Sequence, residues 1–97
     1  MNEMQKSNVY RIAKHYGLKK QKQQALQELN ELSGVLLRRK DQIANKADHK
    51  NNLVDEIADV YVMLEQLKLL YHLKEKDVQQ RITFKLNRQI ERIESEV

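Results

Sequence analysis

Residues Leu53–Leu73 read LVDEIADVYVMLEQLKLLYHL and form an unusually apolar segment. The segment contains neither glycine nor proline, and leucine, glutamate, glutamine and lysine all favour helix. With successive residues about 100° apart around a helix axis, apolar side chains occupy almost its whole circumference. A chain of 97 residues has little surface with which to cover such a helix. The segment therefore predicts a buried helix that is covered in part by a second copy of the chain.

Three further helices are expected from the spacing of apolar residues. Their predicted ranges are Asn8–Tyr16, Leu18 to at least Leu37, and Val78–Ser95. Ser7 is the expected N-cap of the first helix, and Gly17 closes it. The most polar stretch, residues 38–52, is predicted to be a loop, with Asn51 or Asn52 capping the apolar helix. A further break is expected near Lys74–Asp77.

Composition restricts the class of protein. The chain has no cysteine and no proline, so a disulfide scaffold, a cysteine-based zinc site and a thiol nucleophile are excluded. It has no apolar run long enough for a membrane span and no secretory leader pattern at the start, which leads us to expect a cytoplasmic protein. One all-α domain over residues 1–97 is predicted. The excess of 18 Lys and Arg over 14 Asp and Glu favours anionic partners.

Two acidic residues lie inside the apolar arc of the 53–73 helix. Glu56 falls within about 40° of Val60 and Met63, and Asp59 falls about 20° from Leu70. A buried carboxylate is normally protonated, paired with a cation or bound to a metal, because burying it alone costs several kcal/mol.

The preceding helix carries a second acid pair, Glu28 and Glu31, at the edge of its apolar stripe. Two helices that each point an i, i+3 pair from a buried margin would bring four carboxylates around one site. Such a cluster needs cations, and hard ions such as Mg²⁺, or Mn²⁺ in its place, prefer carboxylate oxygens. The alternative is that Glu28 and Glu31 form a solvated margin and that Glu56 pairs with a lysine. Glu91 and Glu94 repeat the ExxE spacing outside an apolar stripe, so spacing alone proves nothing.

A basic stripe follows the predicted last helix. It consists of Arg81, Lys85, Arg88 and Arg92, at steps of four, three and four. If this helix packs beside the two acidic helices, the stripe would supply charge for polyphosphate oxygens. The alternative is a solvated face with ion pairs such as Asp77 with Arg81.

Two motifs together resemble the MazG-like, all-α nucleoside triphosphate pyrophosphohydrolases. QELNEL at Gln27–Leu32 and DEIADVYVMLEQL at Asp55–Leu67 look like the ExxE and ExxD signature of that family, with 24 residues between the two acid pairs. His15–Gly17 and FKLNRQIERI at Phe84–Ile93 also look like its smaller phage and bacterial members. The family often has Glu-Glu at the start of the first signature, where this chain has Gln27 before Glu28.

The resemblance implies a four-helix MazG-like bundle completed by oligomerisation, as a homodimer or homotetramer with the site near a subunit interface. It implies that Glu28, Glu31, Glu56 and Asp59 bind Mg²⁺ and carry catalysis. Lys85, Arg88 and Arg92 of the basic stripe would bind the triphosphate. The implied reaction splits a nucleoside triphosphate, ribo or deoxyribo, into the monophosphate and pyrophosphate.

Two other functions compete with this prediction. The chain could be a non-catalytic helical interaction protein in which the acids are structural and Gln27 marks a decayed site. It could also bind nucleic acid through the basic stripe, but the stripe lacks interleaved aromatic residues, so we do not expect a nucleic-acid partner. No membrane partner is expected either.

Overall fold

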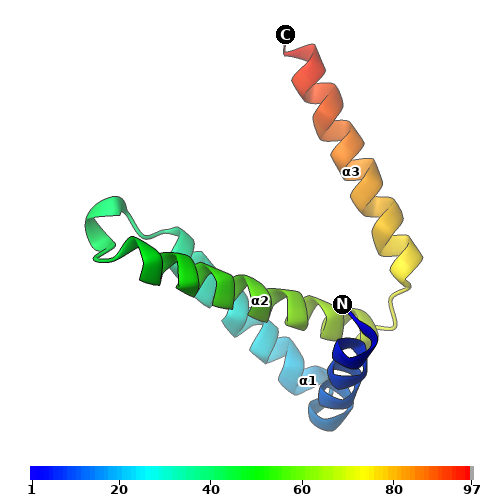
Figure 1. Ribbon diagram of the computed structural model, residues 1–97. Helices are drawn as coiled ribbons and strands as arrows, with labels where there is room; N and C mark the ends of the chain where they lie inside the picture. Colours follow the sequence, from blue (N-terminus) through cyan, green and yellow to red (C-terminus); the bar gives the residue numbers. More distant parts are fainter. Residues whose placement is uncertain (97) are drawn as a thin grey trace.

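The computed structural model describes residues 1–96, in which helices are joined by short connections and no strand occurs. This confirms the predicted all-α class. The helices are α1 (Glu3–Leu36), the 3₁₀ turn η1 (Lys40–Gln42), α2 (Lys46–Leu70) and α3 (Glu75–Ser95). Figure 1 shows α1 and α2 running antiparallel side by side, while α3 projects away from their shared end.

The first two predicted helices are one helix that bends at a glycine. Gly17 interrupts α1 with φ 83° and ψ 172°, a backbone conformation that only glycine adopts readily. The prediction that the chain breaks at Gly17 is confirmed, but the expected start at Asn8 is wrong. The helix begins at Glu3 because Asn2 and Gln5 form a capping box, each side chain bonding the other's backbone N–H at 2.8 Å.

The connection between α1 and α2 is shorter than predicted. The Asn45 side chain accepts hydrogen bonds from the backbone of Ala47 and Asp48, so α2 begins at Lys46. The expected loop over residues 38–52 and the expected caps at Asn51 or Asn52 are therefore wrong. A side-chain cap can stabilise a first helical turn that is polar and exposed to solvent. Because apolar spacing does not detect such a turn, it placed the start of α2 too late.

The α2–α3 joint ends α2 three residues earlier than the predicted Leu73. His72 has φ 57°, and the backbone N–H of Leu73 donates to the Lys68 carbonyl at 2.9 Å, as in a Schellman motif. The Lys68 ammonium also bonds Glu65 at 2.8 Å and contacts Glu75 at the start of α3. This ion pair ties the first turn of α3 to the end of α2. The predicted start of the last helix at Val78 is wrong, because α3 begins at Glu75.

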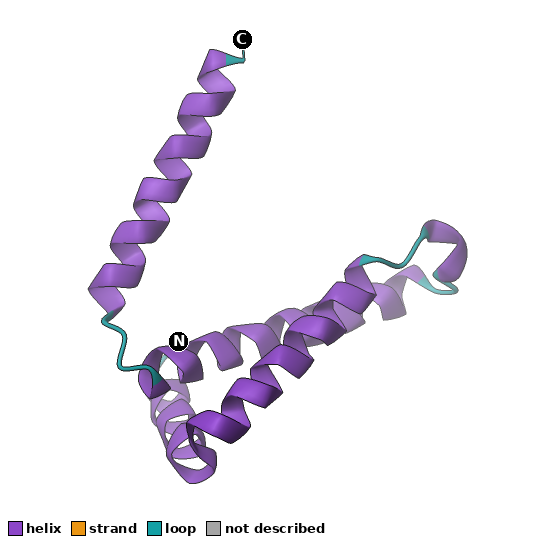
Figure 2. Cartoon of the chain, turned by 180° about the vertical axis from the view of Figure 1, so that it is seen from behind, coloured by secondary structure: helices purple, strands orange, loops and turns teal. Residues whose placement is uncertain are grey.

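The core lies between α1 and α2, the only helices among residues 1–96 that pack extensively against each other. Its buried apolar residues include Ala13, Ala25, Val35 and Met63. Much apolar surface stays uncovered within one chain, because Tyr61 of α2 is 64% exposed and Leu86 of α3 is 58% exposed. Figure 2 shows from behind that α3 stands clear of the α1–α2 pair. Within the described residues, no helix is both long and apolar enough to cross a bilayer.

Candidate metal centre

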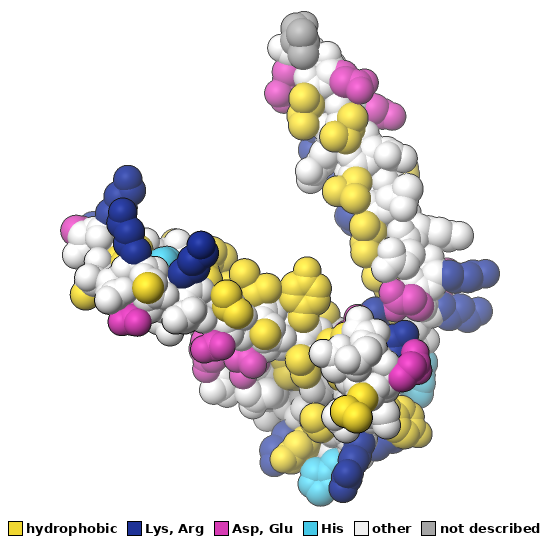
Figure 3. All heavy atoms as spheres, viewed as in Figure 1, with side chains coloured by type: hydrophobic (Ala, Val, Ile, Leu, Met, Phe, Trp, Pro, Cys, Tyr) yellow, Lys and Arg dark blue, Asp and Glu magenta, His cyan; other side chains and the backbone are white. Residues whose placement is uncertain are grey.

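The four predicted acidic ligands meet midway along the α1–α2 pair. Glu28 and Glu31 come from α1, and Glu56 and Asp59 come from α2. Each offers a carboxylate oxygen, and these four atoms all lie within 4.8 Å of one another. Acidic side chains gather visibly on this part of the molecule (Figure 3). The structure thus brings together the two acid pairs that are 24 residues apart in the sequence.

The inner and outer members of the cluster differ in exposure. Glu28 and Glu56 are half-buried, whereas Glu31 and Asp59 are exposed. A cation that arrived from solvent would therefore meet the outer two carboxylates first. The inner two lie closer to the seam between α1 and α2.

Two carboxylate oxygens in the cluster are buried without a hydrogen-bond partner. They are Oε2 of Glu28 and Oε2 of Glu56, one from each helix. The alternative that Glu56 pairs with a lysine is not what the structure shows, because no ion pair within the described residues involves Glu56. Buried polar atoms are seldom left without a partner, and a metal ion is one group that these two oxygens could bind.

The local electrostatics agree with that interpretation. Burial raises the pKa of the Glu56 carboxyl, and the nearby charges of Glu31 and Asp59 raise this pKa further. Burial also raises the pKa of Glu28. The hydrogen bond from Gln24 lowers this pKa, but by less than burial raises it. Like charges held together disfavour ionisation, and a divalent cation would reverse that effect.

Glutamine side chains support the acids of α1, which the sequence patterns did not predict. Gln24 Nε2 donates to Glu28 Oε1 at 2.8 Å, and Gln27 Nε2 donates to Glu31 Oε1 at 3.3 Å. Each donor lies four residues before its acceptor, on the same helix face. Gln27, where the resembled family often has glutamate, therefore orients a carboxylate instead of adding one. The i, i+4 spacing was readable as a signal for both bonds.

The basic stripe is not assembled with the acids within one chain. Lys85, Arg88 and Arg92 lie on α3, which does not pack beside α1 and α2. Asp77 and Arg81 form no ion pair among the described residues. The basic stripe would reach the carboxylates of its own chain only if α3 packed beside α1 and α2, and it does not.

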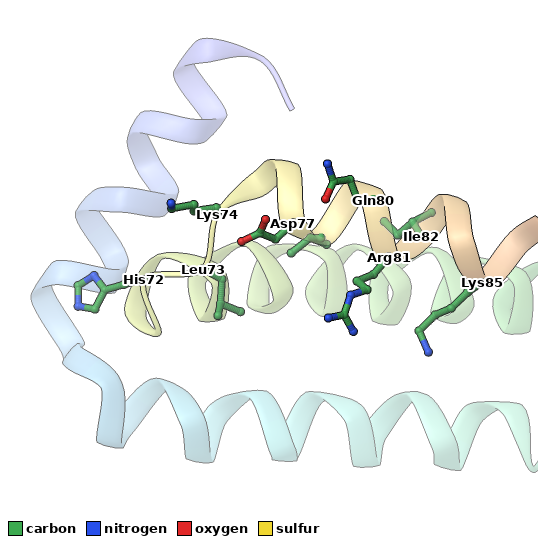
Figure 4. Close-up of a pocket in the computed structure, with 9 residues that line it drawn as sticks. His72, Leu73, Lys74, Asp77, Gln80, Arg81, Ile82 and Lys85 are labelled. Carbon is green, nitrogen blue, oxygen red and sulfur yellow. The ribbon is translucent and has the colours of Figure 1, made fainter.

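A separate cavity of about 620 Å³ lies at the α2–α3 joint, and none of the four clustered acids lines it. Figure 4 shows Arg81 and Lys85 pointing to the same side of α3, with Gln80 on the opposite side. Two members of the basic stripe thus face this cavity together with His72 and Asp77.

The chain was also compared with known proteins. No protein-family model, curated protein or solved structure matches it.

Proposed function

We propose that this chain is a metal-dependent nucleoside triphosphate pyrophosphohydrolase of the MazG-like type. The observation that carries the proposal is the cluster of four carboxylates with two buried oxygens, one from each helix, that have no partner. An arrangement of this kind can hold a divalent cation between two helices, with two exposed carboxylates left at the solvent side.

Mg²⁺ is the proposed ion, with Mn²⁺ as an alternative. Glu28, Glu31, Glu56 and Asp59 would hold the ion, since each offers a carboxylate oxygen and these four atoms lie within 4.8 Å of one another. Bound there, Mg²⁺ would neutralise phosphate charge and lower the pKa of a water molecule.

The clustered carboxylates would carry out the proton transfer that the reaction requires. One clustered carboxylate accepts the proton of the attacking water, whose oxygen forms a bond to the α-phosphorus. The bond between the α-phosphorus and the bridging oxygen breaks, so pyrophosphate leaves with that oxygen and the monophosphate remains. No covalent enzyme intermediate is required.

The basic residues Lys85, Arg88 and Arg92 would bind the triphosphate from a second copy of the chain. Support comes from the position of α3, which stands clear of its own α1–α2 pair and leaves apolar side chains of both α2 and α3 uncovered. A homodimer or homotetramer that buried these surfaces would complete a four-helix bundle and bring cations toward the acids. The substrate is thus held between an acidic pair of helices and a basic third helix.

The first test is a hydrolysis panel of ribo- and deoxyribonucleoside triphosphates with Mg²⁺ and then Mn²⁺. The assay separates monophosphate plus pyrophosphate from diphosphate plus phosphate. We expect pyrophosphate release that falls by about a hundredfold or more in Glu56→Gln, because a general base or ligand is lost. Glu91→Gln is the matched control, since Glu91 has the same ExxE spacing on the exposed surface of α3.

Wild-type turnover in Glu56→Gln would overturn the assignment of the site. A folded protein that cleaves no triphosphate and gains no thermal stability from Mg²⁺ or Mn²⁺ would instead favour the helical interaction protein. The exposed apolar face of α3 is the observation that favours that second candidate.

A further inference from the structure

A buried pair of glutamines joins α1 to α2, outside the carboxylate cluster. Gln21 Nε2 donates to Gln66 Oε1 at 2.6 Å, and the two residues are only 5% and 2% exposed. Gln66 Nε2 lies 3.9 Å from the sulfur of Met63. Gln66 is the most buried large side chain of the described residues. Nothing in the proposed reaction uses this pair.

The glutamine pair and the carboxylate cluster share one alignment of the two helices. Gln21 and Glu28 are seven positions apart on α1, and Asp59 and Gln66 are seven positions apart on α2. Because the helices are antiparallel, a contact between Gln21 and Gln66 sets Glu28 level with Asp59. The same alignment sets Glu31 level with Glu56. Two helical turns, about 10.5 Å, separate the amide bridge from the nearest acids.

The seam between the helices does not by itself select this alignment. Many of its buried and half-buried positions follow alternating steps of four and three residues, the heptad pattern of a coiled coil. These positions are Gln21, Ala25, Glu28, Leu32 and Val35 on α1, and Leu53, Glu56, Val60, Met63, Leu67 and Leu70 on α2. Buried Gln66 lies outside this pattern, one residue before Leu67. A shift of seven residues along such a seam still sets most apolar positions against apolar positions.

The carboxylate cluster opposes the observed alignment when no cation is bound. Four acidic side chains with oxygens within 4.8 Å of one another repel, and a seven-residue shift would move the two pairs about 10 Å apart. A shift would also separate Gln21 from Gln66 and leave two buried amides without each other.

We propose that the Gln21–Gln66 bridge locks the register of α1 against α2 and so holds the four carboxylates together before a cation binds. Both glutamines are positioning residues. This role rests on the proposed function, because it assumes that the carboxylate cluster binds a divalent cation. Single buried polar contacts are known to select one helix register at a cost in stability, because only one alignment pairs them.

The test replaces both amides in Gln21→Leu with Gln66→Leu and measures the register directly. Since the chain has no cysteine, spin labels can be attached at the exposed positions Lys19→Cys and Lys50→Cys. Labelled chains are diluted with unlabelled ones, so that only distances within a chain contribute. Without metal, we expect a single distance with the native glutamines and a second distance about 10 Å away in the double variant.

Metal binding provides the second readout. If the native register falls to about a tenth of the population, the apparent Kd for Mn²⁺ rises about tenfold. Saturating Mg²⁺, which is diamagnetic and does not disturb the spin labels, should then restore the single native distance, because the ion binds only the aligned cluster. Thermal stability should be equal to or above that of the wild type, since both amides are replaced by apolar groups. A merely structural pair would instead show lost stability with an unchanged distance.

Leu67→Met is the control for substitution in the seam, because it conserves volume and keeps both glutamines. A single native distance and an unchanged Mn²⁺ affinity in the double variant would overturn the lock. The distance measurement needs neither metal nor substrate. It therefore decides the register question even if the wild type cleaves no triphosphate, which would count against the proposed function alone.

Discussion

At the scale of single residues, the unusual feature is a pair of carboxylates that the fold holds in an unfavourable state. Glu28 and Glu56 each have one oxygen without solvent or a partner, and burial raises the pKa of both. A residue whose native pKa lies above its unfolded value reduces stability as pH rises. The cost begins near the unfolded value and is complete above the native value.

Glu56→Gln should therefore stabilise the metal-free protein at neutral pH. The amide removes one negative charge from the cluster, and the melting temperature should rise by on the order of a few degrees. The gain should disappear as pH falls through the raised pKa of Glu56 toward its unfolded value, because the wild-type carboxyl then becomes neutral too. Thermal unfolding with a chelator, over a pH series, measures this. A lower melting temperature at pH 7 would contradict the account of an unpartnered carboxylate.

At the scale of elements, α1 depends on one bend. The segment before Gly17 turns away from the part of α1 that packs along α2 (Figure 1). The direction of the first segment is therefore determined by a single backbone conformation. The apolar spacing on the two sides of Gly17 does not predict the direction of the first segment. Such spacing indicates which residues share a helix face, but it does not indicate the direction of the helix axis.

Gly17→Ala should destabilise the protein by about 1–3 kcal/mol, whereas Gly34→Ala should stabilise it by about 0.5–1 kcal/mol. A Cβ at either position would meet nothing within 4 Å, so packing is matched between the two variants. They differ in that Gly17 has φ +83° and Gly34 lies within regular helix. Chemical denaturation measures both changes. Equal effects would show that the bend at Gly17 carries no conformational cost.

At the scale of the whole molecule, a single chain leaves many apolar side chains exposed to solvent. Most of the apolar side chains that recur at helical spacing on α3 are exposed, namely Ile82, Leu86, Ile90 and Ile93, whereas Val78 at the start of the helix is half-buried. The chain spans 42 × 40 × 25 Å, with α3 standing apart from the other helices (Figure 2). Exposed apolar surface of this extent is typical of a protein–protein interface.

We expect sedimentation velocity to show a homodimer or homotetramer at micromolar concentration. Leu86→Glu should weaken assembly by roughly 2 kcal/mol or more, because it sets a charge in the centre of the proposed interface. Gln89→Glu is the matched control, since it adds the same charge to the same helix at an exposed polar position. A monomeric wild type would remove the basis for α3 acting on a second copy.

Much of this protein was readable from sequence because the relevant forces act locally. Helix propensity and apolar spacing identified the all-α class. The i, i+3 spacing of acids at the margins of apolar stripes identified Glu28, Glu31, Glu56 and Asp59 as one cluster. Helix starts were misjudged where a side-chain cap, such as Asn2 or Asn45, stabilised a polar first turn.

The tertiary structure decided what depends on residues far apart in the chain. Gln21 and Gln66 are 45 residues apart, and no local pattern distinguishes a buried amide pair from two solvated glutamines. A heptad seam fits several registers, so only the packed helices show that the two acid pairs stand level. The separation of α3 is likewise a tertiary property, because an amphipathic helix indicates that it will be covered without indicating by which surface.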